Sequence, residues 1–264
     1  MTHIVCVKQV PDPETKVKIN PDTNTLVREG VPSILNPFDQ FALEECIRVK
    51  NKIGGKITAV SMGPLQARTT LLKCLALGAD EAVLLSDNLF AGSDTFTTSY
   101  ILSVAIKKIK DFDIVFCGQQ AIDGDTGQVG PELAHHLGIS QVTYVEEIIS
   151  IDERKSVVKS ISDEGYKIVE AKLPVLLAMF PPSSFKPSNP PLRNILQAKQ
   201  KKFINWDAKK LGIDETRCGL AGSPTRVIRI YPPPLKKKGI IFKEEPEVAC
   251  KKVVEELLGK GVLK

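Results

Sequence analysis

The stretch DIVFCGQQAIDGDTGQVGP (Asp113–Pro131) decides the fold class. It opens with a short apolar run, Asp113–Gly118, which is typical of a buried strand. Glycines then recur at Gly124, Gly127 and Gly130, and a helical pattern follows. A buried strand, a glycine-rich loop and a helix in direct succession predict one strand–loop–helix unit of an α/β protein.

Three similar units precede this one. Each pairs an apolar strand pattern with a helical pattern: strands at 3–7, 56–62 and 81–86, and helices at 41–49, 64–77 and 95–110. Pro64 suits the first turn of the second helix. Such alternation predicts a parallel sheet with helices on both faces. Between Lys16 and Val27, two short alternating runs predict a hairpin outside this sheet.

The second half of the chain has a different pattern. From Val142 to Met179 the apolar period is two, which predicts four consecutive strands, two of them joined by a turn at Ser162–Gly165. We expect these strands to form an antiparallel extension of the parallel core. A proline-rich segment follows, then helices near residues 193–200 and 247–258, an extended stretch at 226–231 and three prolines at 232–234.

These patterns divide the chain into two parts. We expect residues 1–185 to form the α/β domain, and residues 186–264 to form a docking loop and a C-terminal arm. The arm has too little apolar sequence for a core of its own, so we expect it to pack on a partner subunit. The alternative is that it folds back on its own domain.

Composition excludes several classes of protein. The chain has 264 residues, 42% apolar and 25% charged, without a run of the roughly 20 apolar residues that span a membrane and without a signal peptide, so we expect a cytoplasmic protein. Six cysteines lack metal-ligand spacing, and the adjacent His135 and His136 point apart, so no metal site is expected. The net charge of +5 is concentrated in lysines after residue 186, which favours a solvated or protein-docking face over nucleic-acid binding.

Ligands of parallel α/β sheets bind beyond the carboxyl ends of the strands. Of the loops that leave such ends, the one from Gly118 to Pro131 is the most unusual. Its glycines let the backbone approach a ligand, and the helix start favours phosphate. Asp125 or Thr126 is expected to cap this helix, with Gln128 completing a capping box.

The loop has neither standard phosphate motif, because GxGxxG after the first strand and GxxxxGK[ST] are both missing. Asp123 and Asp125 would repel a phosphate unless they face ribose hydroxyls, a cap or a cation. The residues alone therefore leave two readings open, a nucleotide loop and a structural glycine-rich turn. We find no catalytic acid–base constellation, which suits a cofactor that performs its own chemistry.

Seven short motifs nevertheless occur in a recognisable order over nearly the whole chain. They are VKQVPD (7–12), NPFD (36–39), SMGP (61–64), LALGAD (75–80), GQQAID (118–123), AKLPVLL (171–177) and LRNILQAKQKK (192–202). In order and spacing this series resembles the β subunits of electron-transfer flavoproteins. Family members usually carry an acidic residue and a second carboxylate or amide before the LPxLL motif, where this sequence has Ser162 and Lys167.

The resemblance implies an adenine-nucleotide-binding fold paired with an α subunit that carries FAD. Ordinary members hold AMP as a structural ligand. Electron-bifurcating members hold a second FAD that accepts hydride from NADH, and the electrons part toward ferredoxin and, through the α-subunit FAD, toward a flavin-containing dehydrogenase. The loop DGDTGQVGP resembles the bifurcating type, since Gly124 and Thr126 stand where AMP-type members have bulkier or more acidic residues. The chain is then a redox subunit and an electron carrier rather than a stand-alone enzyme.

The resemblance also implies which residues contact the cofactor, with Asn36 and Asp39 at the adenosine end and the backbone amides of Asp125 to Gln128 at phosphate. The expected contacts are Cys6, Asn36, Pro37, Phe38, Asp39, Met62, Gln120, Ala121, Ile122, Asp123, Gly124, Asp125, Thr126, Gly127, Gln128, Val129 and Gly130. Leu192 is expected to anchor the dehydrogenase, with the following lysines as a polar rim. An AMP-binding subunit is the alternative function. An ATP-using enzyme is a further one, although the phosphate loops that it needs are missing.

Overall fold

The computed structural model describes residues 1–13, 19–20, 25–26, 32–228 and 239–263. The chain divides into two units, Met1–Ile228 and Arg229–Lys264. We expected this boundary after residue 185. Strand β13 (Lys202–Trp206), which we did not predict, pairs with the main sheet, so the first unit extends beyond residue 185. The docking role of residues 186–264 stays a prediction.

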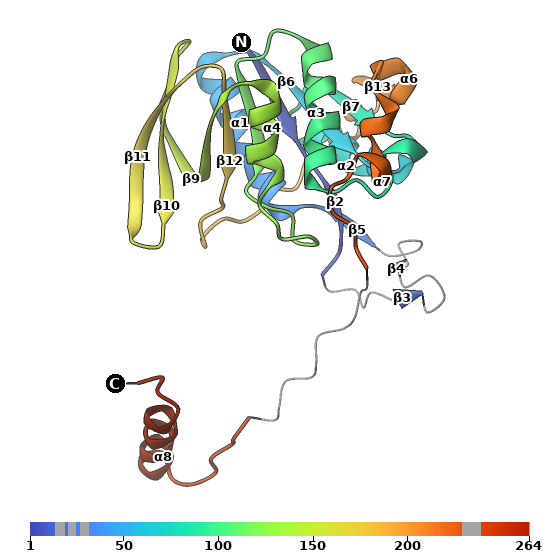
Figure 1. Ribbon diagram of the computed structural model, residues 1–264. Helices are drawn as coiled ribbons and strands as arrows, with labels where there is room; N and C mark the ends of the chain where they lie inside the picture. The colour runs from blue at the N-terminus through green and yellow to red at the C-terminus, as the bar shows by residue number, and fades with distance from the viewer. Residues whose placement is uncertain (14–18, 21–24, 27–31, 229–238, 264) are drawn as a thin grey trace. The chain divides into compact units, whose positions relative to one another are not determined.

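Among the described residues, the first unit is built on a nine-stranded sheet, whose arrangement is drawn in Figure 1. Neighbouring parallel strands form its core, in the spatial order β12 (Val175–Met179), β8 (Ile114–Gly118), β1 (Thr2–Cys6), β6 (Lys56–Met62), β7 (Glu81–Leu85) and β13. The expected parallel α/β core is confirmed.

Where the chain is described, two small antiparallel pairs lie outside this sheet. Strands β2 (Gln9–Pro11) and β5 (Ser33–Leu35) form one pair. Strands β3 (Ile19–Asn20) and β4 (Thr25–Leu26) form the other, which confirms the expected hairpin, although its turn lies outside the described residues.

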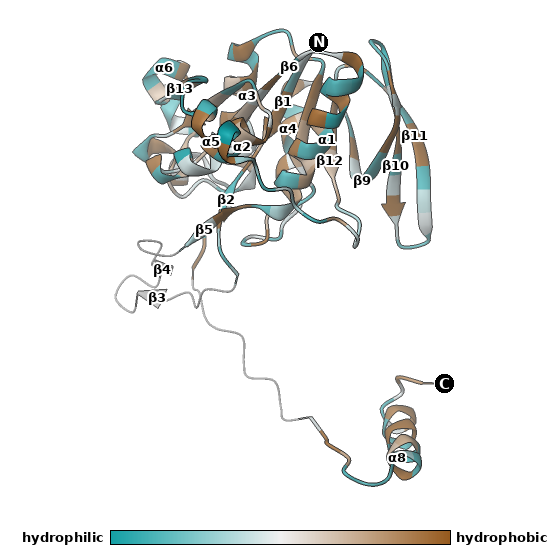
Figure 2. Ribbon diagram, turned by 180° about the vertical axis from the view of Figure 1, so that it is seen from behind, coloured by the Kyte–Doolittle hydropathy of each residue, from teal (hydrophilic) through white to brown (hydrophobic). Residues whose placement is uncertain are grey.

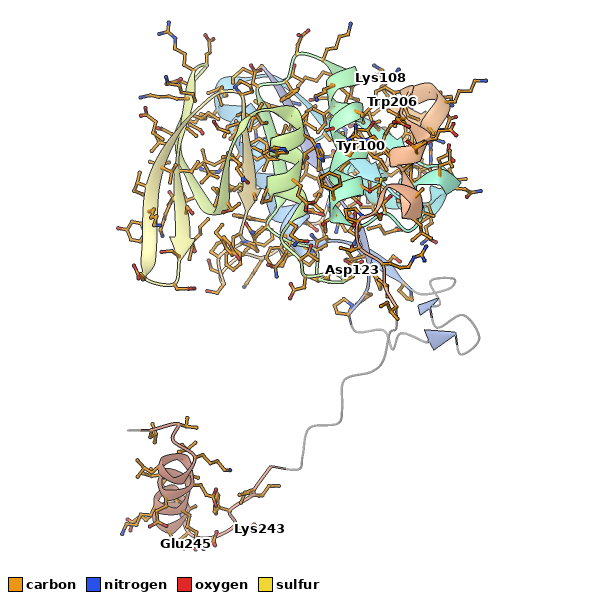
Figure 3. All side chains as sticks on the ribbon, in the orientation of Figure 1. Tyr100, Lys108, Asp123, Trp206, Lys243 and Glu245 are labelled. Atoms are coloured by element: carbon orange, nitrogen blue, oxygen red, sulfur yellow. The ribbon has the colours of Figure 1, made fainter. Side chains whose placement is uncertain are left out.

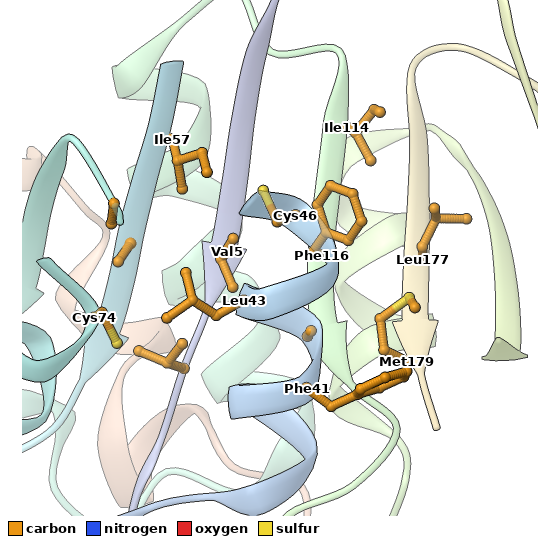
Figure 4. Packing of buried hydrophobic residues seen from close by; sticks show 14 of the residues in the cluster. Val5, Phe41, Leu43, Cys46, Ile57, Cys74, Ile114, Phe116, Leu177 and Met179 are labelled. Carbon is orange, nitrogen blue, oxygen red and sulfur yellow. The ribbon is translucent and has the colours of Figure 1, made fainter. Parts of the chain in front are cut away.

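Helices cover both faces of the sheet. Those on one face are α1 (Pro37–Ile53), α2 (Arg68–Leu77) and α5 (Leu192–Ala198). Those on the other are α3 (Thr95–Ile109), α4 (Val129–Leu137), α6 (Ala208–Leu211) and α7 (Gly219–Gly222). Figure 4 shows the first face, where Val5 and Phe116 of the sheet pack against Leu43 of α1. Each fully buried side chain of this size stabilises the fold by roughly 1.5–3 kcal/mol.

The described part of the first unit also contains three single turns of 3₁₀ helix: η1 (Leu65–Ala67), η2 (Asn88–Phe90) and η3 (Glu215–Arg217). The first of them corrects a prediction. We expected one helix over residues 64–77, but Pro64 has an extended backbone and precedes η1, and α2 begins only at Arg68. Proline favours the first turn of a helix without fixing which kind of turn follows.

The expected antiparallel extension is confirmed for three strands, β9 (Ser140–Ile151), β10 (Lys155–Ser162) and β11 (Gly165–Lys172). The expectation was wrong for the fourth, β12. It lies between β9 and β8 and runs parallel to both of its partners. All of its residues are buried, as in central parallel strands whose two faces are both covered.

Strand β9 turns back on itself. β11 ends at Lys172, beside the start of β10, and β12 starts at Val175, which pairs with Ser140 at the start of β9. The three residues from Lys172 to Val175 span at most about 11 Å, so the start of β10 lies near the start of β12. Because β10 follows β9 directly, the end of β9 also lies there, and both ends of β9 are at the amino edge of the sheet. The corner falls at Tyr144, whose φ of 52° is left-handed, and Figure 1 shows the resulting V in the ribbon.

The second unit is described by helix α8 (Pro246–Gly259), which confirms the helix expected at 247–258. Its exposed apolar side chains include Val248, Val253, Val254 and Leu258, and Figure 2 shows apolar and polar stretches on one short helix. Residues 229–231 of the extended stretch expected at 226–231, and the three prolines, lie outside the described residues. Within the described part of the chain, no helix has both the length and the apolar character needed to cross a membrane.

Candidate functional site

The site lies where the strand order reverses. From β1 the chain passes to β6 on one side, whereas β8, which follows later, lies on the other side of β1. The loop after β1 leads to α1 on one face, and the loop after β8 leads to α4 on the opposite face. Diverging loops of this kind open a crevice at the carboxyl edge of the sheet, where α/β proteins bind ligands. Figure 3 places Asp123 at this edge.

Asp39 joins the two loops. Its Oδ2 accepts from the backbone N–H of Lys8 at 2.7 Å, and its Oδ1 accepts from that of Gly118 at 3.0 Å. The side chain lies in the first turn of α1 and is buried. Burial raises the pKa of Asp39 to about 7, against the opposing effect of these hydrogen bonds.

Asn36 makes a second connection between the same loops. Its Nδ2 donates to the Gln120 carbonyl at 2.9 Å, and its Oδ1 accepts from the Ile122 N–H at 3.3 Å. Although it precedes α1, its side chain does not cap that helix. Asn36 and Asp39 therefore hold the crevice together, and their expected contact with an adenosine stays a prediction.

The two aspartates of the glycine-rich loop have partners of their own. Lys8 Nζ lies 2.7 and 2.8 Å from the carboxylate oxygens of Asp123. The carboxylate of Asp125 accepts from Gln120 Nε2. These partners reduce the repulsion that the two carboxylates would exert on a phosphate. A loop with two aspartates needs such partners if it is to bind phosphate. Lys8 was missing from the expected site residues, although it follows the first strand.

Helix α4 begins with free backbone donors. Its N-cap is Gln128, and no side chain caps it, so the capping roles expected of Asp125 and Thr126 were wrong. The carboxylate of Asp125 accepts from Gln120, and the backbone amide of Asp125 donates to the Ala121 carbonyl at 2.8 Å. This amide was expected to hold phosphate, but it already has a partner.

The next four amides remain. Among the described residues, no hydrogen-bond partner is found for the N–H groups of Thr126, Gly127, Gln128 and Val129. Free N–H groups at the positive end of a helix attract anions. The left-handed φ of Gly127, 64°, helps to turn successive amides toward one point. This part of the loop fits a phosphate group.

The three loop glycines differ in their surroundings. No atom lies within 4 Å of the position that a Cβ on Gly124 would take, so the loop is open there. A Cβ on Gly130 would lie 3.1 Å from Cys117 Sγ, so this glycine lets α4 pack closely on β8. Gly124 therefore leaves room for a ligand, and Gly130 is required by packing.

The remaining expected contacts lie at the same edge. Cys6 ends β1 and Met62 ends β6. Burial raises the pKa of the Cys6 thiol to about 12, which makes it unreactive. Pro37 and Phe38 open α1 next to Asn36. The expected cofactor residues thus come from four separate parts of the chain to the carboxyl edge of the sheet, and their contact with a cofactor stays a prediction.

The expected docking residue lies elsewhere. Leu192 is the first residue of α5 and is 73% exposed. The lysine rim expected beside it was wrong in part. Lys201 Nζ donates to the carbonyls of Leu75 and Ala79, at 2.8 and 2.7 Å, at the end of α2. Lys202 Nζ lies 3.1 Å from Glu81 at the sheet edge. The docking role of Leu192 stays a prediction.

This arrangement defines a class of protein. A doubly wound sheet whose switch-point crevice presents free amides at a helix start is that of a nucleotide-binding α/β protein. In the described part of the chain, no group of three or more histidine, cysteine or acidic side chains is placed to hold a metal ion.

Comparison with known proteins identifies the family. Residues 23–211 match the model described as the electron transfer flavoprotein domain. The β subunit of electron transfer flavoprotein from Thermoanaerobacterium thermosaccharolyticum is 47% identical over 264 residues, all of both chains. Protein FixA of Bradyrhizobium diazoefficiens is 39% identical over 97% of this chain and 91% of its own. Subunit CarD of the caffeyl-CoA reductase-Etf complex of Acetobacterium woodii is 45% identical over 90% of each chain.

The chain therefore belongs to the electron transfer flavoprotein family, among its β subunits. Membership implies pairing with an α subunit and binding of a flavin or AMP. The crevice fits such a ligand, because the amides of Thr126 to Val129 suit its phosphate and the loop is open at Gly124.

Proposed function

We propose that this chain is the β subunit of an electron-bifurcating flavoprotein and that its crevice holds FAD rather than AMP. When bound, FAD would accept hydride from NADH and deliver electrons to ferredoxin and, through the α-subunit FAD, to a flavin-containing dehydrogenase. This chain binds and orients the cofactor. Asn36 and Asp39 fix the crevice, and the amides of Thr126 to Val129 hold phosphate.

The observation that carries the proposal is the open, polar loop from Asp123 to Gly127. Lys8 pairs with Asp123, Gly124 has free space around it, and the side chain of Thr126 is exposed. A ligand that continues beyond its first phosphate needs such room, whereas a nucleoside monophosphate does not. The same free amides would also hold the single phosphate of AMP, so this alternative is decided by the experiment below.

A relative supports the dehydrogenase partner. CarD is a subunit of a complex that joins an Etf to a caffeyl-CoA reductase. We extend this arrangement to the present chain as a complex with an acyl-CoA-type flavin dehydrogenase. The exposed apolar surface at the start of α5 (Leu192, Ile195 and Leu196) is the proposed contact.

Coupled electron transfer tests the proposal. The chain is co-expressed with its α subunit, and ferredoxin reduction by NADH is followed spectroscopically with and without the dehydrogenase and its acceptor. We expect ferredoxin to be reduced only when the dehydrogenase and its acceptor are both present, since the two reductions are coupled. A complex that NADH does not reduce, although it exchanges electrons with the dehydrogenase, would instead be an AMP-type carrier.

A further inference from the structure

We infer that the corner of β9 carries an aromatic surface that takes the flavin ring of FAD. The ring of Phe180 lies 5.8 Å from that of Phe38 and 5.7 Å from that of Tyr144, between centroids. The three rings come from the end of β12, the start of α1 and the corner of β9. All three are partly exposed, and Tyr144 is 43% exposed. The inference rests on the proposed function, because it names what holds the second half of FAD.

The position of Tyr144 is fixed by a buried side chain. A left-handed φ is uncommon for a tyrosine and persists only where its surroundings hold it. Here the Tyr144 N–H donates to Gln119 Oε1 at 2.7 Å, and the Gln119 N–H donates to the Met179 carbonyl at 2.8 Å. Gln119 is only 5% exposed. It therefore ties the corner of β9 to the ends of β8 and β12.

Gln119 also places the aromatic surface next to the glycine-rich loop. It directly precedes the loop, and its Nε2 lies 3.4 Å from the position that a Cβ on Gly127 would take. Gly127 carries one of the free amides proposed to hold phosphate. The aromatic surface thus adjoins the phosphate end of the crevice.

The order of the strands sets the direction of the ligand. We take the adenosine half to lie beside Cys6 and Met62, two of the expected cofactor contacts, which end β1 and β6 on one side of β8. Strands β12 and β9 lie on the other side of β8. A dinucleotide whose phosphates lie at the start of α4 would therefore extend toward Phe180 and Tyr144. Planar rings stack favourably on exposed aromatic side chains.

Two ligands that differ by the ring test this inference. The full heterodimer is freed of β-site nucleotide by dialysis, and its affinities for FAD and for ADP-ribose are measured by titration calorimetry. ADP-ribose has the adenosine, both phosphates and a ribose but no flavin. We expect Tyr144→Leu and Phe180→Leu to weaken FAD binding about three- to tenfold and to leave ADP-ribose binding within about twofold. Tyr144→Phe keeps a ring, and Tyr166→Leu removes an exposed ring of β11, so both should match wild type.

Other outcomes would overturn the inference. Unchanged FAD affinity in the leucine variants would do so, as would an equal loss for both ligands. Weaker association of the two subunits with FAD affinity unchanged would make the corner a subunit contact instead. Failure of the wild-type β site to bind FAD would overturn the proposed function itself. FAD binding by the wild-type heterodimer is therefore measured before any variant is made.

Discussion

The carboxyl group of Asp39 accepts hydrogen bonds from two loops that leave the sheet toward opposite faces. The contact is close because Gly118 has no side chain. A Cβ there would lie 2.4 Å from Asp39 Oδ1 and 2.6 Å from Phe38 Cβ, nearer than such atoms can approach. The geometry of the crevice at the residue scale thus depends on one buried carboxyl group and one glycine.

Replacing Gly118 with alanine is expected to destabilise the chain by about 1–3 kcal/mol, because Asp39 and the start of α1 must move to admit the methyl group. Nucleotide content should fall in the same variant. For the free energy of unfolding, Gly124→Ala is the matched control, since nothing lies within 4 Å of its added Cβ. Urea unfolding and cofactor extraction measure both effects, and equal stability of the two variants would contradict this account.

The raised pKa of Asp39, about 7, predicts a pH dependence of stability. Between pH 4 and 7 the folded carboxyl group holds its proton while the unfolded one has lost it. Stability contributed by this group is therefore complete below about pH 4 and is lost as the pH rises toward 7, by on the order of 1 kcal/mol per pH unit.

Asp39→Asn removes this titration. The difference in free energy of unfolding, wild type minus variant, should fall from pH 5 to pH 7 and then level off in urea titrations. Parallel curves for the two proteins across this range would show that burial does not control the protonation of Asp39.

At the scale of elements, the start of α4 and the reversal of β9 shape the site. Helix α4 starts late, at Val129, and leaves four amides free of partners in the described chain. Strand β9 reverses at Tyr144 and brings an aromatic ring to the carboxyl edge of the sheet. Gln119, which follows β8, holds the corner of β9 through its bond from the Tyr144 N–H.

The free amides predict opposite effects of one charge on stability and on binding. Gln128→Glu places a carboxylate at the N-cap of α4. Its interaction with the helix dipole stabilises the helix by about 0.3–1 kcal/mol, but the same charge repels phosphate. We expect unchanged or higher thermal stability and about tenfold weaker binding of AMP or FAD. Gln141→Glu, an exposed position on β9, should change neither. Equal nucleotide affinity in the two variants would move the phosphate away from this helix.

At the scale of the whole molecule, the two units have different bases of stability. Met1–Ile228 contains both apolar clusters of the sheet. Helix α8, in contrast, exposes Val248, Val253, Val254 and Leu258. A helix with such a surface is stabilised by packing on another surface.

A chain that ends at Ile228 should therefore keep its fold and lose its partner. We expect its thermal midpoint to stay within a few degrees of the full chain, because the sheet and both of its helix layers remain. Its association with the α subunit, followed by size-exclusion chromatography, should become too weak to detect. Undiminished association would show that α8 is not the contact.

The sequence was sufficient for those parts of the fold that local pattern determines. Alternating strand and helix signals predicted the parallel core, and glycine spacing located the loop around which the site is built. It was insufficient where distant segments decide. Whether VLLAM in β12 joins the core or the extension depends on its neighbours, and β13 was hidden in a lysine-rich segment whose charges are satisfied by α2 and Glu81.

The partners of the site's polar groups could not be predicted either, because they come from distant segments of the chain. Lys8 and Asp123 are far apart in the chain, and only the sheet order brings them to 2.7 Å. The reversal of β9 had no sequence signal, because a tyrosine in a left-handed conformation is uncommon and no glycine marks the corner.

The cofactor content of the purified heterodimer distinguishes a β subunit that holds FAD from one that holds AMP. The complex is denatured, and the released nucleotides are separated by chromatography and counted against protein. We expect two FAD per heterodimer and no AMP, one FAD from each subunit. One FAD with one AMP would contradict this expectation and leave an ordinary electron carrier whose β subunit holds AMP for structure.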